Sequence, residues 1–119
     1  MADKDSPRSV TMVPSQVAAI SELVKVAPEA IVSRVLLRSP VGSVTLFAFA
    51  AGQELAEHTA PFDALVQVVA GRLELTIGGR PVTVTGGELV VMPARVPHAL
   101  RAAADSTMIL TMLRDRGEG

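Results

Sequence analysis

The sequence has no cysteine, tryptophan or tyrosine, and its only aromatic residues besides two histidines are three phenylalanines. Without cysteine the chain cannot form a disulfide, a thiolate nucleophile or a cysteine-ligated zinc site. Its 11 basic and 12 acidic residues are spread along the chain and leave a net charge of −1. Nucleic-acid binding requires a basic surface, often with stacking aromatic rings. We therefore expect no nucleic-acid partner.

The chain also lacks a long uninterrupted apolar run, although 49% of its residues are hydrophobic and its mean hydropathy is +0.40. The longest candidate, residues 39–53, is broken by Pro40, Gly42 and Gly52, whereas a membrane-spanning helix needs about 20 apolar residues. The first residues do not show the basic-then-apolar order of a signal peptide. We expect a cytoplasmic protein without membrane association, in which the surplus apolar side chains line a ligand cavity or a subunit interface.

The length of 119 residues indicates one domain. Residues 1–14 are polar and contain two prolines, so we expect a flexible arm there. The domain itself is expected over residues 15–113, and the charged, glycine-rich residues 114–119 are expected to form a flexible tail. The domain should begin with a short helix over residues 15–27, capped by Ser15. Four apolar residues support this helix because they recur at helical spacing: Val17, Ile20, Leu23 and Val24.

Beyond Pro28 the apolar residues follow the alternation that is typical of strands. Strand-like segments separated by glycine and proline turns cover residues 31–38, 43–50, 65–69, 72–77, 81–85, 88–92, 97–101 and 107–113. Gly78 and Gly79 are typical of a two-residue hairpin turn, because both positions tolerate a positive φ. Seven to nine short strands with regular turns predict an all-β antiparallel sandwich or barrel.

Two histidines, His58 and His98, are the only ones in the chain, and each lies in a recognisable motif. The first motif is Gly52, five residues, then His58, with Gly71 further on. The second is Gly87, five residues, Pro93, and then His98. In order and spacing these motifs resemble the two signature motifs of the cupin superfamily. The resemblance covers residues 44–113 and implies an antiparallel jelly-roll β-barrel.

The resemblance also implies a metal site, and here the chain departs from the family pattern. Family members with the full set hold a divalent ion such as Mn, Fe, Ni or Zn with three histidines and one glutamate. Ala60 and Ala64 occupy two of those four ligand positions, so only His58 and His98 match. We expect a divalent transition metal to be held weakly or not at all. Asp63 is a weak candidate for a third ligand, because a one-residue bulge would turn it inward.

Two further departures change the second motif, in which Arg95 replaces the family glycine and Ala102 the final asparagine. Arg95 would lie at the cavity mouth, where it could pair with a carboxylate ligand; a solvated loop arginine is the plainer interpretation. The methionines of the strands suit an irregular pocket, although a plain core is their more common role. The candidate pocket residues are His58, His98, Phe62, Met92, Arg95, Met108 and Met112.

Two functional hypotheses follow, and a purely structural role is a third. In the first, the chain is a single-domain cupin that binds a small molecule in its barrel. In the second it is an enzyme: a metal-dependent dioxygenase or isomerase using His58 and His98, or a metal-free epimerase with either histidine as general base. The incomplete ligand set favours binding. We also expect a homodimer, because residues 15–27 and 31–37 would otherwise expose apolar surface and an open strand edge.

Overall fold

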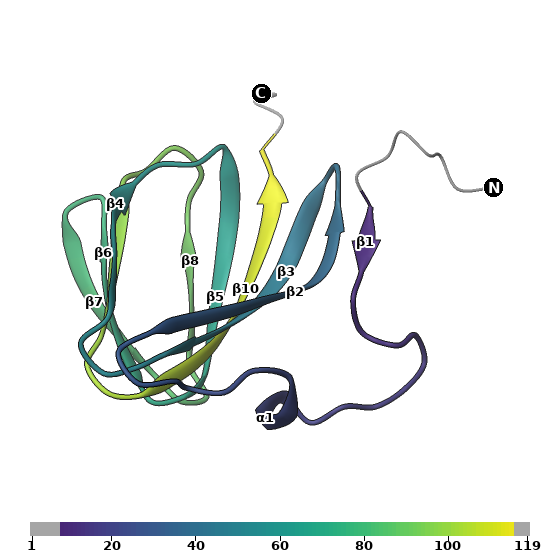
Figure 1. Cartoon of the computed structure of the whole chain (residues 1–119). Helices are drawn as coiled ribbons and strands as arrows, with labels where there is room; N and C mark the ends of the chain where they lie inside the picture. The colour runs from purple at the N-terminus through teal and green to yellow at the C-terminus, as the bar shows by residue number, and fades with distance from the viewer. Residues whose placement is uncertain (1–7, 116–119) are drawn as a thin grey trace.

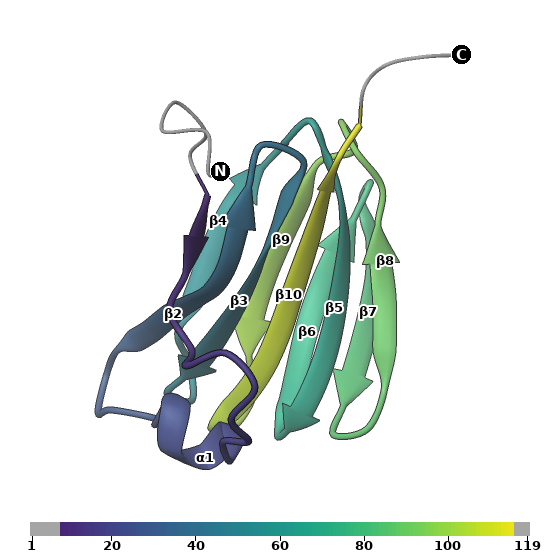
Figure 2. The ribbon, with the colours of Figure 1, turned by 90° about the vertical axis from the view of Figure 1, so that its right-hand side faces the viewer.

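Two antiparallel β-sheets face each other in this protein (Figure 1), whose computed structural model describes residues 8–115. The larger sheet contains, in spatial order, β1 (Ser9–Val10), β2 (Ile31–Ser39), β3 (Gly42–Phe49), β10 (Ser106–Arg114), β5 (Phe62–Ala70) and β8 (Leu89–Met92). The smaller sheet contains β4 (Glu54–His58), β9 (His98–Ala102), β6 (Arg72–Ile77) and β7 (Arg80–Thr85). The C-terminal strand β10 lies between β3 and β5 (Figure 2). This architecture confirms the predicted all-β antiparallel jelly roll.

Side chains along each strand alternate between the interior and the surface, and β6 shows this pattern clearly. Leu73 and Leu75 are buried, whereas Glu74 between them faces outward and forms ion pairs with Arg72 and Arg101. The strand ends in the predicted hairpin. Its two glycines have φ angles of 57° and 80°, and Ile77 lies opposite Arg80 across the turn. Both positive φ angles are those that a two-residue turn of type I′ requires.

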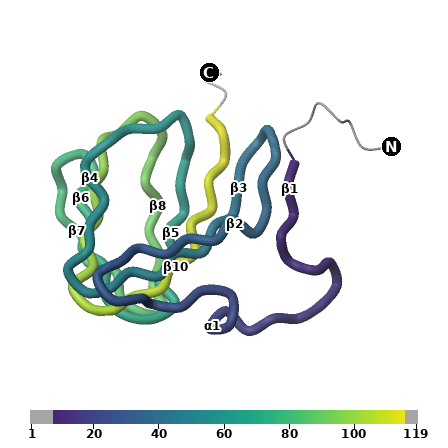
Figure 3. Tube along the Cα trace, in the orientation of Figure 1, coloured from purple at the N-terminus to yellow at the C-terminus, as the bar shows by residue number. Residues whose placement is uncertain are grey.

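The main hydrophobic core fills the space between the sheets. Its fully buried members include Phe49, Val66 and Leu73. A second, smaller cluster lies on the outer face of the larger sheet, where Leu46 and Ala48 contact the N-terminal segment. The N-terminal segment therefore runs outside the barrel (Figure 3) and takes no part in its interior.

The N-terminal helix is much shorter than the predicted 15–27, because α1 covers only Ile20–Leu23. Ser15 has a φ angle of +68° and caps no helix, and Val17 is fully exposed. Only a few side chains of this segment reach the sheet, and a helix without an apolar face to pack is marginal in water. With α1 this short, no helix within residues 8–115 is long and apolar enough to cross a membrane.

The expected arm and tail fall partly within the described residues. Ser9 and Val10 pair with Arg38 and Leu37 of β2, so this part of the arm extends the larger sheet. At the other end, Arg114 belongs to β10. Residues 1–7 and 116–119 lie outside the described part of the chain.

Candidate functional site

The two histidines meet because their strands are neighbours in the smaller sheet. His58 is the last residue of β4 and His98 the first of β9, and the antiparallel pairing places them opposite each other. Although they are 40 residues apart in sequence, their Nε2 atoms are 3.2 Å apart. The rings lie edge to face, with centroids 4.4 Å apart. The fold thus brings together the two imidazoles that the sequence motifs singled out.

Each imidazole uses its other nitrogen to bind the backbone. His58 Nδ1 lies 3.0 Å from the Ala56 carbonyl oxygen, and His98 Nδ1 lies 3.2 Å from the Val96 carbonyl oxygen. A carbonyl oxygen can only accept a hydrogen bond, so each Nδ1 is the donor and carries the hydrogen. In the neutral state of each ring, Nε2 is therefore the unprotonated nitrogen. Two lone pairs face each other across 3.2 Å.

The two rings differ in exposure, which affects their electrostatics. His98 is buried, with 9% of its surface exposed, whereas His58 is exposed at the end of the barrel. Burial lowers the pKa of His98; its bond to the Val96 carbonyl opposes this shift, and the nearby His58 adds to it. The environment of His98 thus favours its neutral form.

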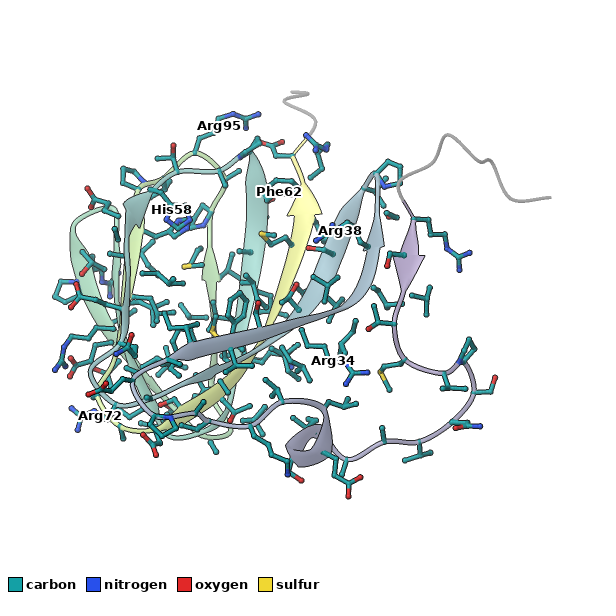
Figure 4. The ribbon with its side chains drawn as sticks, viewed as in Figure 1. Arg34, Arg38, His58, Phe62, Arg72 and Arg95 are labelled. Carbon is teal, nitrogen blue, oxygen red and sulfur yellow. The ribbon has the colours of Figure 1, made fainter. Side chains whose placement is uncertain are left out.

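A cavity of about 320 Å³ lies between the sheets beside this pair. The only polar side chains among its lining residues are the two imidazoles. The lining consists of Phe47, Leu55, His58, Ala60, Phe62, Ala64, Met92, His98, Ala99, Leu100, Met108, Leu110 and Met112. Figure 4 shows His58 turned toward the space between the two sheets. The site is thus an apolar cavity that is polar only where the side chains of His58 and His98 meet.

Every predicted pocket residue except Arg95 lines this cavity. Arg95 adopts a φ angle of 64°, which turns the chain after β8, and its guanidinium pairs with Asp115 instead. In Figure 4 it projects away from the barrel. Sequence reasoning also missed several apolar lining residues, of which Leu110 had a detectable signal: it lies two residues from both Met108 and Met112, on the same face of a strand.

Asp63 does not reach the histidines, contrary to the expectation of a bulge. The pairing of β5 with β10 is regular from Phe62 to Val68. Alternation therefore turns Asp63 outward because its neighbour Ala64 faces inward. Its carboxylate accepts a hydrogen bond of 2.9 Å from the Ala94 N–H. Glu57, the neighbour of His58 on β4, lies in a groove with the charged side chains Glu54, Glu74 and Arg101 and does not line the cavity.

The lining residues do not supply the donor set of a tightly held metal. Ala60 and Ala64, at the positions where the family pattern has ligands, both line the cavity, but they offer only methyl groups. Within residues 8–115, no three side chains of His, Cys, Asp or Glu are grouped so that they could hold a metal ion. A catalytic metal usually has at least three protein ligands, and the residues that line this cavity provide two.

The loops around His58 are tied to one another, and we call these contacts the mouth ring (residues 60–63, 94–95 and 115). The Arg95 N–H donates to the Ala60 carbonyl oxygen and the Asp115 N–H to the Pro61 carbonyl oxygen, both at 2.9 Å. The Arg95–Asp115 ion pair and the Asp63 bond to Ala94 complete the ring. These contacts give Arg95 and Asp63 structural roles at the cavity mouth.

Solved structures with the same fold include proteins with related sequences. A conserved protein of unknown function from Streptococcus pyogenes is 31% identical, with a TM-score of 0.83 over 87% of this chain and 90% of that chain. A cupin 2 conserved barrel domain protein from Leptotrichia buccalis is 36% identical, with a TM-score of 0.74 over 80% of this chain and 46% of that one. A cupin superfamily protein from Desulfitobacterium hafniense is 20% identical, with a TM-score of 0.81 over 87% and 95% of the two chains.

No curated protein matches the sequence. The family described as Cupin domain does match, and the match spans residues 45–114. These residues include both histidine motifs and all residues that line the cavity. The match covers more than half of the sequence, and the Streptococcus protein aligns over most of it. This chain therefore belongs to the cupin family.

Proposed function

We propose that this chain binds a small, mainly apolar molecule in the cavity between its two sheets. The observation that carries the proposal is the chamber of about 320 Å³, whose side chains are apolar except for two adjoining imidazoles. Ligand pockets are typically concave, mostly apolar and equipped with a few convergent polar groups that orient the ligand. This volume is near the lower end of the usual range of roughly 300–1,000 Å³, which favours a small ligand.

The residues that line the cavity favour a binding protein over an enzyme. A histidine that acts as general base is usually oriented by a partner that stabilises the imidazolium it becomes. Here each Nδ1 faces a neutral backbone carbonyl, and no carboxylate lines the cavity. A metal-dependent reaction would require a more complete ligand set than two imidazoles. We therefore propose a ligand-binding role.

A divalent ion at this place would have His58 and His98 as its only protein ligands, with water or the bound molecule supplying the others. Two neutral imidazoles do not neutralise the charge of the ion, and no carboxylate from the lining helps. We expect such binding to be weak and exchangeable.

The methionines allow a direct test of the proposal. Three of the five methionines, Met92, Met108 and Met112, line the cavity, whereas Met12 does not. The chain carrying ¹³C-methyl methionine would be screened by NMR against small phenols, carboxylic acids and alkylbenzenes. We expect ligands that shift the three cavity methyl signals and leave Met12 unchanged. Shifts at Met12 alone, or no shift from any compound, would contradict the proposal.

A further inference from the structure

We infer that the molecule held in this cavity presents a hydrogen-bond donor, an O–H or N–H group, to the facing Nε2 atoms of His58 and His98. The inference rests on the proposed function and adds the chemical class of the ligand: an apolar body with at least one donor. A molecule with only acceptors, or with no polar group, does not satisfy the site.

The first step concerns the tautomer of each imidazole ring. The Ala56 and Val96 carbonyl oxygens each take the hydrogen of an Nδ1, so in the neutral pair both Nε2 atoms are acceptors. They lie 3.2 Å apart. Facing lone pairs repel each other unless a donor is shared between them.

The second step is that no lining side chain supplies that donor. Apart from the two histidines, the lining residues are Phe, Leu, Ala and Met, none of which carries an O–H or N–H on its side chain. The rings could bond to each other only if one carried a hydrogen on Nε2, which either breaks its Nδ1 bond to the backbone carbonyl or makes it a cation. The lining holds no carboxylate to balance such a cation, and His98 is buried.

The third step is the geometry of the remaining space. An O–H oxygen at the usual 2.7–3.0 Å from a nitrogen can be within reach of both Nε2 atoms at once, because these are only 3.2 Å apart. The rest of the molecule would then extend toward Phe47, Met108 and Leu110, which are partly or fully buried on the larger sheet. A ligand without a donor would cover the Nε2 of the buried His98 and leave its lone pair unsatisfied, which weakens binding by roughly tenfold or more.

Matched probes test the inference without altering the protein. 4-tert-Butylphenol, 4-tert-butyltoluene and 4-tert-butylanisole share one apolar body and carry an O–H, a methyl or a methoxy group. Their affinities would be measured by titration of the ¹³C-methyl methionine signals at neutral pH, in the presence of EDTA to remove adventitious metal. We expect the phenol to bind roughly tenfold or more tightly than the other two, although the toluene is the most apolar by composition.

The outcomes separate this inference from the proposed function. Equal affinities, or tighter binding of the toluene, would overturn the donor requirement and leave the apolar cavity as a binding site. Binding by none of the three, with no other ligand found in the screen, would overturn both. If the phenol is preferred only when EDTA is omitted, a metal ion binds the two Nε2 atoms, and the inference is overturned.

Two further measurements address the histidines themselves. The variant His58→Phe/His98→Phe keeps ring-shaped side chains but removes both acceptors, so we expect it to lose the preference for the phenol over the toluene. In the wild-type chain, the long-range ¹H–¹⁵N NMR spectrum of its two histidines reports the tautomers directly. Both rings must show a protonated Nδ1 and an unprotonated Nε2 at neutral pH; a protonated Nε2 in either ring would refute the inference even if the variant fails to fold.

Discussion

The interior between the sheets has a packed half and a hollow half, and the same strands form both. On β5, Val66 and Val68 fill the packed half, whereas Ala64 lines the cavity. On β9, Ala102 lies in the packed half and His98 in the cavity. The cavity therefore does not come from a separate element. It lies at the end of these strands that carries Ala64 and His98.

The packed half should carry more of the stability. Leu73 is fully buried there, and Leu73→Ala should lower the free energy of unfolding by about 2–5 kcal/mol. The matched control is Leu89→Ala, because Leu89 is 60% exposed, and this change should cost less than about 0.5 kcal/mol. Urea denaturation measures both. Equal losses would contradict a stabilising role for the buried Leu73 in the packed half.

The hollow half should gain a metal site when its missing ligands are restored. Ala60→His together with Ala64→Glu would place an imidazole and a carboxylate beside the existing pair, since both positions line the cavity. We expect this variant to retain roughly one transition-metal ion per chain after dialysis, as measured by mass spectrometry, whereas the wild type retains much less.

The control for this metal gain puts the same side chains outside the cavity, as Thr59→His with Gln67→Glu. Thr59 is exposed, and Gln67 alternates with the inward-facing Val66 and Val68. This control should retain no more metal than the wild type. Stoichiometric metal in the wild type would show that two protein ligands suffice.

Filling the cavity should weaken ligand binding while leaving the packed half intact. Ala60→Leu adds bulk to the lining and should reduce the affinity for 4-tert-butylphenol by roughly tenfold, because the ligand and the new side chain compete for one space. Ala104→Leu, at an exposed position in the turn after β9, should have no effect. NMR titration compares the three chains, and an unaltered affinity in Ala60→Leu would place the ligand elsewhere.

The smallest expected effect concerns pH. Burial lowers the pKa of His98 below its ordinary value of 6.5, so the unfolded chain takes up a proton before the folded chain does. Stability should therefore decrease as the pH falls from about 6.5 toward the lower pKa of the folded state, and should be unaffected by this residue above that window. Urea denaturation from pH 7.5 to 5.5 should show this decrease in the wild type and a smaller one in His98→Phe. The same slope in both chains would show that His98 is not the group responsible.

Local sequence patterns predicted the fold and the centre of the site. Alternating apolar residues and the Gly78–Gly79 turn were enough for most of the strands, although β4, which carries His58, was not among the predicted segments. The match of His58 and His98 to the two cupin motifs led us to expect both beside one cavity, and both line it. The resemblance to the cupin motifs also identified Ala60 and Ala64 as the positions that lack ligands.

The errors concern properties that depend on distant parts of the chain. Asp63 faces outward because the pairing of β5 with β10 continues without a bulge. Arg95 pairs with Asp115, which is 20 residues further along. The helix predicted from Ser15 is short because little of that segment finds a surface to pack against. Such outcomes depend on strand register and tertiary contact, which a local pattern does not contain.

The mouth ring also indicates a position at which a fluorescent reporter of ligand binding could be attached. Thr59 is exposed between His58, which lines the cavity, and Ala60, which the ring holds in place. Because the sequence contains no cysteine, Thr59→Cys would create a single thiol for a fluorescent dye at the cavity mouth. Entry of a ligand would change the surroundings of that dye, so the labelled chain would serve as its own sensor.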